Sequence, residues 1–351
     1  MNLNSKTTRE SGIELLRIIA ASGIVFSHFL NDGDIGNLQG SSFVVYDALR
    51  TPVACAVNVF LVIMGYFSCL SSKRTLGKPI SLIIQMSFYG IVLYSILTLL
   101  GYHTWSIKDF VWSAVPYSWF VTLYLVMFFI SPYINLIISN LSRREWKWFL
   151  GFFITFYSIW PMVLGIIESV NKYYEAWSTI GRCGDFAGYH IITFILMYCV
   201  GSCIRLNKID EKMSLRHAFY GLIAMILIDF CLRLIPINST PWHIARWYSN
   251  IFVIGMTFYS FILFKKLRIK SSIINTFATC AFTIYLIHTK LFIVVDTVSV
   301  IRQWIPVSLA TILCFIIVVC VISFILYKVY SLLFGRAISN LDKYKIPYFD
   351  K

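Results

Sequence analysis

The sequence predicts an all-α fold, a polytopic membrane bundle of about ten transmembrane helices with both termini in the cytoplasm. Composition is the first observation, because 58% of the 351 residues are hydrophobic and only 13% are charged, whereas about 25% of a soluble domain is charged. The second is that apolar stretches long enough to cross a hydrocarbon layer of about 30 Å recur along the whole chain. The third is an alternation of positive charge between successive loops.

The apolar stretches follow one another with short connections, so no separate soluble domain is expected. We predict a single membrane-embedded domain over residues 1–351, with a core at about 10–335 and a cytoplasmic tail at about 336–351. The expected spans lie at 12–30, 52–70, 79–101, 117–138, 148–167, 186–204, 217–235, 247–264, 273–295 and 306–334.

The orientation follows from the positive residues, because loops rich in Lys and Arg remain in the cytoplasm. With the N-terminus inside, 21 of the 30 Lys and Arg residues fall on the inner side and seven on the outer side. Most of the net charge of +14 then lies on the cytoplasmic side of the predicted topology, where it faces anionic membrane lipids. No basic run carries interleaved aromatic residues, so nucleic acid is not an expected partner.

Several soluble chemistries are excluded by their missing signatures. The sequence has no phosphate-binding G-x-x-x-x-G-K-[ST] loop, no H-E-x-x-H and no G-x-S-x-G. Its nine cysteines form no C-x-x-C pair, so we predict no metal site and no bound cofactor. The chemistry must therefore come from polar groups in or beside the spans.

The first span, GIELLRIIAASGIVFSHFL, contains two such groups, Arg17 and His28. An arginine at the centre of a bilayer costs about 2.5–3.5 kcal/mol, so such a residue normally faces a bundle interior or a cavity. Eleven residues make three helical turns plus about 20°, which places both side chains on one face about 16 Å apart. Histidine also has an ordinary pKa near 6.5, which suits acid–base catalysis.

Two readings of these ionisable residues stay open. Glu14 precedes Arg17 by three residues, so the two could neutralise each other on the helix surface instead of binding a ligand. The histidines His28, His103, His190, His243 and His288 all fall toward the outer side of the predicted topology, where histidine can also serve as an interfacial residue.

The first span, with R-IIAASGIVFS-H, resembles the signature of the acyltransferase family 3 membrane proteins, ten-span O-acyltransferases that modify bacterial polysaccharides. Later segments resemble the same family in the same order, with one departure, because Met64 stands where many members have serine in "SGY". The segments are RTPVACAVNVFLVIMGYF, SWFVTLYLVMFFISPYIN, RWYSNIFVIGMTFY and FATCAFTIYLIHTKLF, and the likeness covers about residues 10–330.

The resemblance implies transfer of an acyl group, usually acetyl, from acyl-coenzyme A to a hydroxyl of a cell-surface polysaccharide or its lipid-linked precursor. The enzyme would lie in the plasma membrane of a bacterium. His28 and Arg17 are then the expected catalytic residues, with His28 as base or acyl carrier and Arg17 holding the polar part of the donor. The expected substrate-binding residues are Glu14, Arg50, Trp119, Tyr285 and His288.

Two other classes of function remain as alternatives. A transporter or flippase for a lipid-linked glycan would line its path with intramembrane charge, but the two halves of the chain show no pair of broken helices at corresponding positions. A glycan polymerase would be expected to carry a large charged outer loop, whereas the predicted outer loops at about 31–51 and 168–185 contain few acidic residues.

Overall fold

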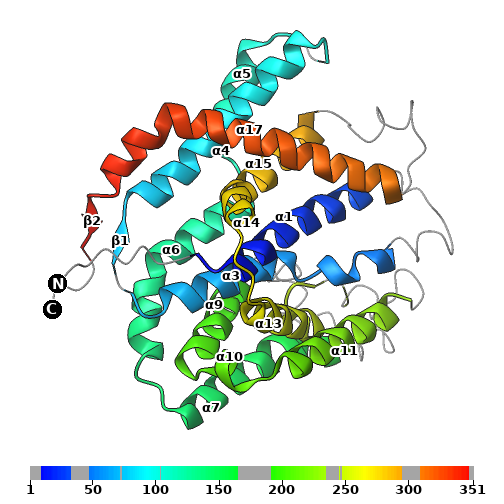
Figure 1. Cartoon of the computed structure of the whole chain (residues 1–351), viewed down its shortest axis with the longest axis vertical. Coiled ribbons are helices and arrows are strands. Elements are labelled where there is room, and N and C mark those ends of the chain that lie inside the picture. The colour runs from blue at the N-terminus through cyan, green and yellow to red at the C-terminus, as the bar shows by residue number, and fades with distance from the viewer. Residues whose placement is uncertain are drawn as a thin grey trace.

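The computed structural model describes residues 9–32, 47–71, 73–102, 104–164, 191–234, 245, 247–294 and 309–347, most of them in helices (Figure 1). The longer helices are α1 (Ser11–Asp32), α3 (Ala56–Ser68), α4 (Gly77–Leu99), α6 (Trp119–Ile138), α7 (Arg143–Ile154), α9 (Ile191–Leu206), α11 (Leu215–Arg233), α13 (Ile251–Lys266), α15 (Ala281–Val294) and α17 (Leu309–Leu341). Shorter elements are η2 (Thr51–Val53), α5 (Ile107–Ala114), the π-helical turn η3 (Thr155–Ile159), α10 (Ile209–Lys212), α14 (Ser272–Phe277) and η6 (Ala278–Cys280).

In the described part of the chain, seven helical segments are long and apolar enough to cross a membrane, which makes this a multi-pass membrane protein. They are Ser11–Leu30, Asp47–Ser68, Gly77–Leu99, Ile107–Ile138, Arg143–Leu164, Leu215–Arg233 and Ala310–Leu341. The other expected spans fall on α9, α13 and the pair α14–α15. A helix of 16 residues, such as α9 or α13, is only about 24 Å long. The count of ten and the side of the termini stay predictions.

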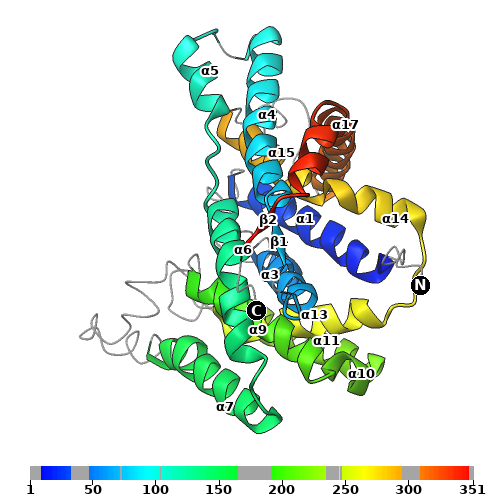
Figure 2. The ribbon, with the colours of Figure 1, turned by 90° about the vertical axis from the view of Figure 1, so that its left-hand side faces the viewer.

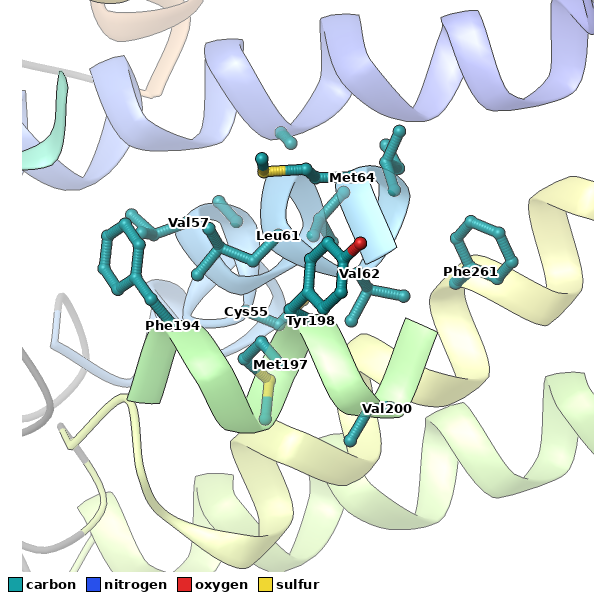
Figure 3. Close-up of a cluster of buried hydrophobic side chains, with 14 of the residues drawn as sticks. Cys55, Val57, Leu61, Val62, Met64, Phe194, Met197, Tyr198, Val200 and Phe261 are labelled. Carbon is teal, nitrogen blue, oxygen red and sulfur yellow. The ribbon is translucent and has the colours of Figure 1, made fainter. Parts of the chain in front are cut away.

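Helix α1 lies at the centre of the helical assembly and contacts α3, α13, α15 and α17 (Figures 1 and 2). Helix α3 is buried along most of its length between α1 and α9, as Figure 3 shows from its side chains. Residues on α1 that face α3 or α15 are therefore the ones that can line an interior cavity.

The contact between α3 and α9 depends on two glycines. A Cβ at Gly65 would collide with the backbone carbonyl of Tyr198, and one at Gly201 would collide with that of Val62. Small residues let two helices approach this closely in membrane proteins. Gly65, which belongs to the family-like "GY" segment, therefore fixes the position of α3 relative to α9.

The sequence predicts only helices, yet the described part of the structure also has two short strands. Strand β1 (Arg74–Thr75) pairs antiparallel with β2 (Lys345–Ile346). The Thr75 hydroxyl donates to Asp342 Oδ1 at 2.8 Å, so the pairing is supported by a side chain. Helix α17 also continues to Leu341, past the expected core boundary at about 335. Part of the predicted tail is thus attached to the loop after α3.

Candidate active site

Arg17 and His28, which the sequence predicts on one face of α1, line two different cavities beside that helix. The first, which we call the Arg17 cavity, has a volume of about 270 Å³ and extends from α1 to α3, α4, α6 and α15. The second, the His28 cavity, has a volume of about 120 Å³ and is also lined from η2 and α3. Ile24 and Tyr285 line both cavities.

The pairing of Arg17 with Glu14, one of the two possibilities left open by the sequence, is present. Arg17 Nη1 donates to Glu14 Oε1 at 3.0 Å and to Oε2 at 3.2 Å. The pair does not remove Arg17 from the cavity, because the arginine side chain keeps 33% of its surface exposed and lines the cavity wall. A guanidinium has five N–H donors, so one carboxylate leaves others for a ligand.

Most walls of the Arg17 cavity are apolar. They include Phe60, Ile63 and Met64 of α3 and Phe282 of α15, and Met64 lies on the side of α3 that faces α1 (Figure 3). Lys78 is a second cation in the wall, and its Nζ donates to Tyr124 Oη at 3.0 Å. Neither Lys78 nor Tyr124 was predicted from the sequence, although Lys78 belongs to the basic segment between two expected spans. The Arg17 cavity therefore combines mostly apolar walls with the cationic side chains of Arg17 and Lys78.

The His28 cavity is more polar, and Arg50 is fixed within it. Arg50 donates to Ser27 Oγ from both Nε (3.1 Å) and Nη2 (2.9 Å), and from Nη1 to Asp47 Oδ1 at 3.3 Å. Trp119 at the start of α6 lines the same cavity and stacks on Tyr248, with ring centroids 6.5 Å apart. Arg50 and Trp119, both predicted as substrate-binding, thus lie in the wall of one cavity with His28.

A buried ionic network lies behind Arg50. Arg233 Nη1 is 3.6 Å from Asp47 Oδ2, and its Nε donates to Asp229 Oδ2 at 3.0 Å. Asn250 completes the network by donating to Asp229 Oδ1 at 3.0 Å, while its own Oδ1 accepts the backbone N–H of Phe252 at the start of α13. Asp47, Asp229 and Arg233 each expose no more than 3% of their side chains.

The sequence alone does not predict this network. Arg50 and Arg233 are two of the seven Lys and Arg residues expected in loops on the outer side, whereas in the structure their side chains are only 15% and 3% exposed. A usable signal was present, because Asp229 is a carboxylate inside the predicted span at 217–235 and precedes Arg233 by four residues. Residues at that spacing are neighbours on a helix, and an intramembrane carboxylate deserves the same interpretation as Arg17.

His288 lies behind His28. It is fully buried and is not among the residues that line either cavity in the described part of the chain. The rings of His28 and His288 meet edge to face with centroids 5.1 Å apart. His288 Nδ1 lies 2.9 Å from the carbonyl of Ile284, and because a carbonyl only accepts, that nitrogen carries the proton. His288 therefore contacts the candidate catalytic histidine, while its binding of substrate stays a prediction.

Tyr285 lies between the two cavities. Its hydroxyl is 3.1 Å from Ser118 Oγ, and its ring packs on Phe120 with centroids 5.3 Å apart. Three other histidines expected toward the outer side, His103, His190 and His243, lie outside the described residues, as do most of the predicted outer loops at 31–51 and 168–185.

The comparison with family models decides the class of protein. The model of acyltransferase family 3, described as an acyltransferase domain, matches residues 10–328. This chain belongs to acyltransferase family 3. The match covers nearly the whole chain, and it confirms the resemblance found in the sequence. No curated protein and no solved structure matches this member of the family.

Membership in acyltransferase family 3 makes this chain a membrane acyltransferase. The three residues of the "MGY" segment, Met64, Gly65 and Tyr66, have different roles in the structure of this family member. Gly65 packs on α9, and the Tyr66 hydroxyl donates to Asp210 Oδ2 at 2.6 Å and accepts from Arg205 Nη1 at 3.0 Å. Met64 lines the Arg17 cavity, so a thioether, and not the serine hydroxyl that the sequence resemblance leads one to expect at this position, contributes to this cavity.

Proposed function

We propose that this chain is an O-acyltransferase that moves an acyl group, in the first instance acetyl, from acyl-coenzyme A to a hydroxyl of a cell-surface polysaccharide or its lipid-linked precursor. The enzyme would act in the plasma membrane of a bacterium, with Arg17 toward the cytoplasm. The observation that carries this proposal is the placement of Arg17 and His28 in adjoining cavities on one helix.

The Arg17 cavity suits the donor. Coenzyme A carries phosphate groups and a pantetheine amide, which match the N–H donors of a guanidinium. The thioester and the acyl chain are apolar, and they match the walls formed by residues such as Phe60, Ile63 and Phe282. Glu14 keeps the guanidinium oriented toward the cavity and leaves donors available.

The His28 cavity suits a sugar acceptor. A sugar hydroxyl is a weak nucleophile until a base within hydrogen-bond reach takes its proton, and we assign this role to His28. Arg50 and Trp119 face the same space, where a guanidinium can donate to sugar hydroxyls and an aromatic ring can cover the apolar face of the sugar. His288, in contact with the His28 ring, is a positioning residue for that base.

In the proposed reaction, the acceptor oxygen forms a bond to the thioester carbonyl carbon, and the carbon–sulfur bond breaks. The hydroxyl proton passes to His28 and then to the departing thiolate, which leaves as coenzyme A. No oxidant or reductant is needed. The alternative in which His28 carries the acyl group transiently gives the same products.

The test replaces His28 with Ala in the native host and compares the surface polysaccharide by NMR. General base catalysis contributes about 10²- to 10⁴-fold in rate, so O-acylation should disappear while the protein remains in the membrane at its normal amount. A matched control is His217→Ala, because His217 is an exposed histidine near the start of α11 and bonds to Ser214. Unchanged acylation in His28→Ala would remove His28 from the chemistry.

Membrane vesicles supplied with labelled acetyl-coenzyme A separate acyl transfer from the transporter and polymerase alternatives. We expect the label to enter an alkali-labile ester of the polysaccharide only when the wild-type chain is present. Vesicles that export or extend the glycan without incorporating label would contradict the proposal.

A further inference from the structure

Two side chains mark the boundary between the two cavities. Among the described residues, Ile24 and Tyr285 are common to both linings, and each is 6% exposed. Ile24 precedes His28 by four residues on α1, and Tyr285 precedes His288 by three residues on α15. Residues at these spacings are neighbours on a helix, so each side of the boundary lies next to one of the two contacting histidines.

The start of helix α6 holds Tyr285 in place. Ser118 is the N-cap of α6, since its Oγ accepts the N–H of Val121 at 3.5 Å, and the same oxygen lies 3.1 Å from Tyr285 Oη. The two residues that follow Ser118 line different cavities. Trp119 lines the His28 cavity, and Phe120 lines the Arg17 cavity. The position of the tyrosine is thus tied to the helix that contributes walls to both cavities.

This boundary is where the reacting atoms must meet if the proposed function holds. A donor held in the Arg17 cavity has to bring its carbonyl carbon next to a hydroxyl held in the His28 cavity. The His28 cavity is small, about 120 Å³, and contains Arg50 and Arg233, so an apolar acyl tail is disfavoured there. The acyl group must therefore fit against Ile24 and Tyr285.

We propose that Ile24 and Tyr285 determine the length of the acyl group that this enzyme transfers. The proposal rests on the proposed function and goes further, because it names the residues that select the substrate. The covalent step is the one given above: the acceptor oxygen bonds to the carbonyl carbon, the carbon–sulfur bond breaks, and the proton goes through His28 to the thiolate. A larger side chain at the boundary leaves less room for the acyl tail, and a smaller one leaves more.

The experiment measures a ratio of two donors in one sample. A host strain lacking its own copy of this gene expresses each full-length variant, and its membrane vesicles receive an equimolar mixture of acetyl- and butyryl-coenzyme A. Acyl esters are then released from the polysaccharide by alkali and quantified by mass spectrometry. The amount of folded enzyme cancels in the butyryl-to-acetyl ratio, so reduced expression of a variant does not change the result.

Ile24→Ala should raise the butyryl-to-acetyl ratio by about 10-fold or more, because one methylene in an apolar pocket is worth about 10- to 200-fold in selectivity. Ile24→Val removes a single methylene and should shift the ratio in the same direction by less, which keeps the test usable if the alanine variant does not fold. Tyr285→Phe keeps the ring but loses the contact with Ser118, so we expect a smaller increase in the ratio.

Ile262→Ala is the matched control. Ile262 of α13 is fully buried and is not among the described residues that line either cavity, so the same truncation is made away from the donor and the acceptor and should leave the ratio unchanged. An unchanged ratio in both Ile24 variants would overturn the inference, and so would an equal shift in Ile262→Ala. A wild-type chain that transfers neither acyl group would overturn the proposed function, and this inference with it.

Discussion

The Arg17 cavity and the His28 cavity use charge in different ways. Arg17 is paired with Glu14 on the same helix turn, and the arginine is one-third exposed. In the His28 cavity, Arg50 and Arg233 are held by Asp47 and Asp229, and these carboxylates are buried. A local pair can change without moving other helices, whereas the buried network connects Asp47, Arg50 and α11. The local pair at Arg17 is therefore suited to a cation that binds a ligand, whereas the buried network around Arg50 and Arg233 is suited to a rigid cavity wall.

This difference also predicts where mutations affect folding and where they affect binding. Solvent-exposed ion pairs contribute about 0.2–1 kcal/mol to stability, and the Arg17–Glu14 pair is closer to this case because Arg17 keeps 33% of its side chain exposed, although Glu14 is buried. Breaking a buried ion pair is much more destabilising, about 3–5 kcal/mol, because the remaining charge has no solvent and no partner. Three experiments test the contrast.

The largest effect on stability is expected from Arg233→Met. This change leaves Asp229 without its cation and removes the second cation of Asp47, so we expect a loss of about 3–5 kcal/mol in the free energy of unfolding. Thermal melting of the detergent-solubilised protein measures the effect. The double variant Arg233→Met with Asp229→Asn removes both charges and should recover part of the loss. A single variant that melts like the wild type would show that the network does not stabilise the wall.

Arg50→Lys is expected to have an intermediate effect, and the effect is on binding of the acceptor. Lysine keeps the positive charge but cannot make both contacts to Ser27 together with the one to Asp47. Hydrogen bonds to charged groups contribute about 1.5–3 kcal/mol, so we expect the KM for the acceptor to rise by about 10-fold or more. The KM for acyl-coenzyme A should not change. Initial rates in vesicles measure both constants, and Ser27→Ala should give a smaller change of the same kind.

The smallest effect on stability is expected from Glu14→Gln, which should change the free energy of unfolding by no more than about 1 kcal/mol. Arg17→Lys should be equally mild for stability but should raise the KM for the donor several-fold, because lysine lacks the planar fork of donors. Melting curves and donor titrations in vesicles check these two expectations. If Glu14→Gln destabilised the protein as much as Arg233→Met, the distinction between the two cavities would be wrong.

Part of the candidate site could be predicted because a charge inside an apolar segment is conspicuous. Arg17 and His28 stand out in the first span, and helical geometry places them on one face. Asp229 gives the same signal inside the predicted span at 217–235, but Arg233 lies near the end of that span, where the sequence predicts a cation of the outer loop and not a partner for Asp229. Asp47 could not be connected to either residue from the sequence, because it lies in a distant segment and meets Arg233 only after α11 packs beside η2.

The sequence by itself determined the class of fold, the family and the helix that carries Arg17 and His28, since hydropathy, charge spacing and local motifs are properties of contiguous residues. Only the tertiary structure decided that these two residues face separate cavities, that Ile24 and Tyr285 divide them, and that His288 lies behind His28 and not in the cavity wall. Cavities form where helices distant in the sequence fail to fill space completely, so their walls depend on how α1, α3, α6 and α15 pack together.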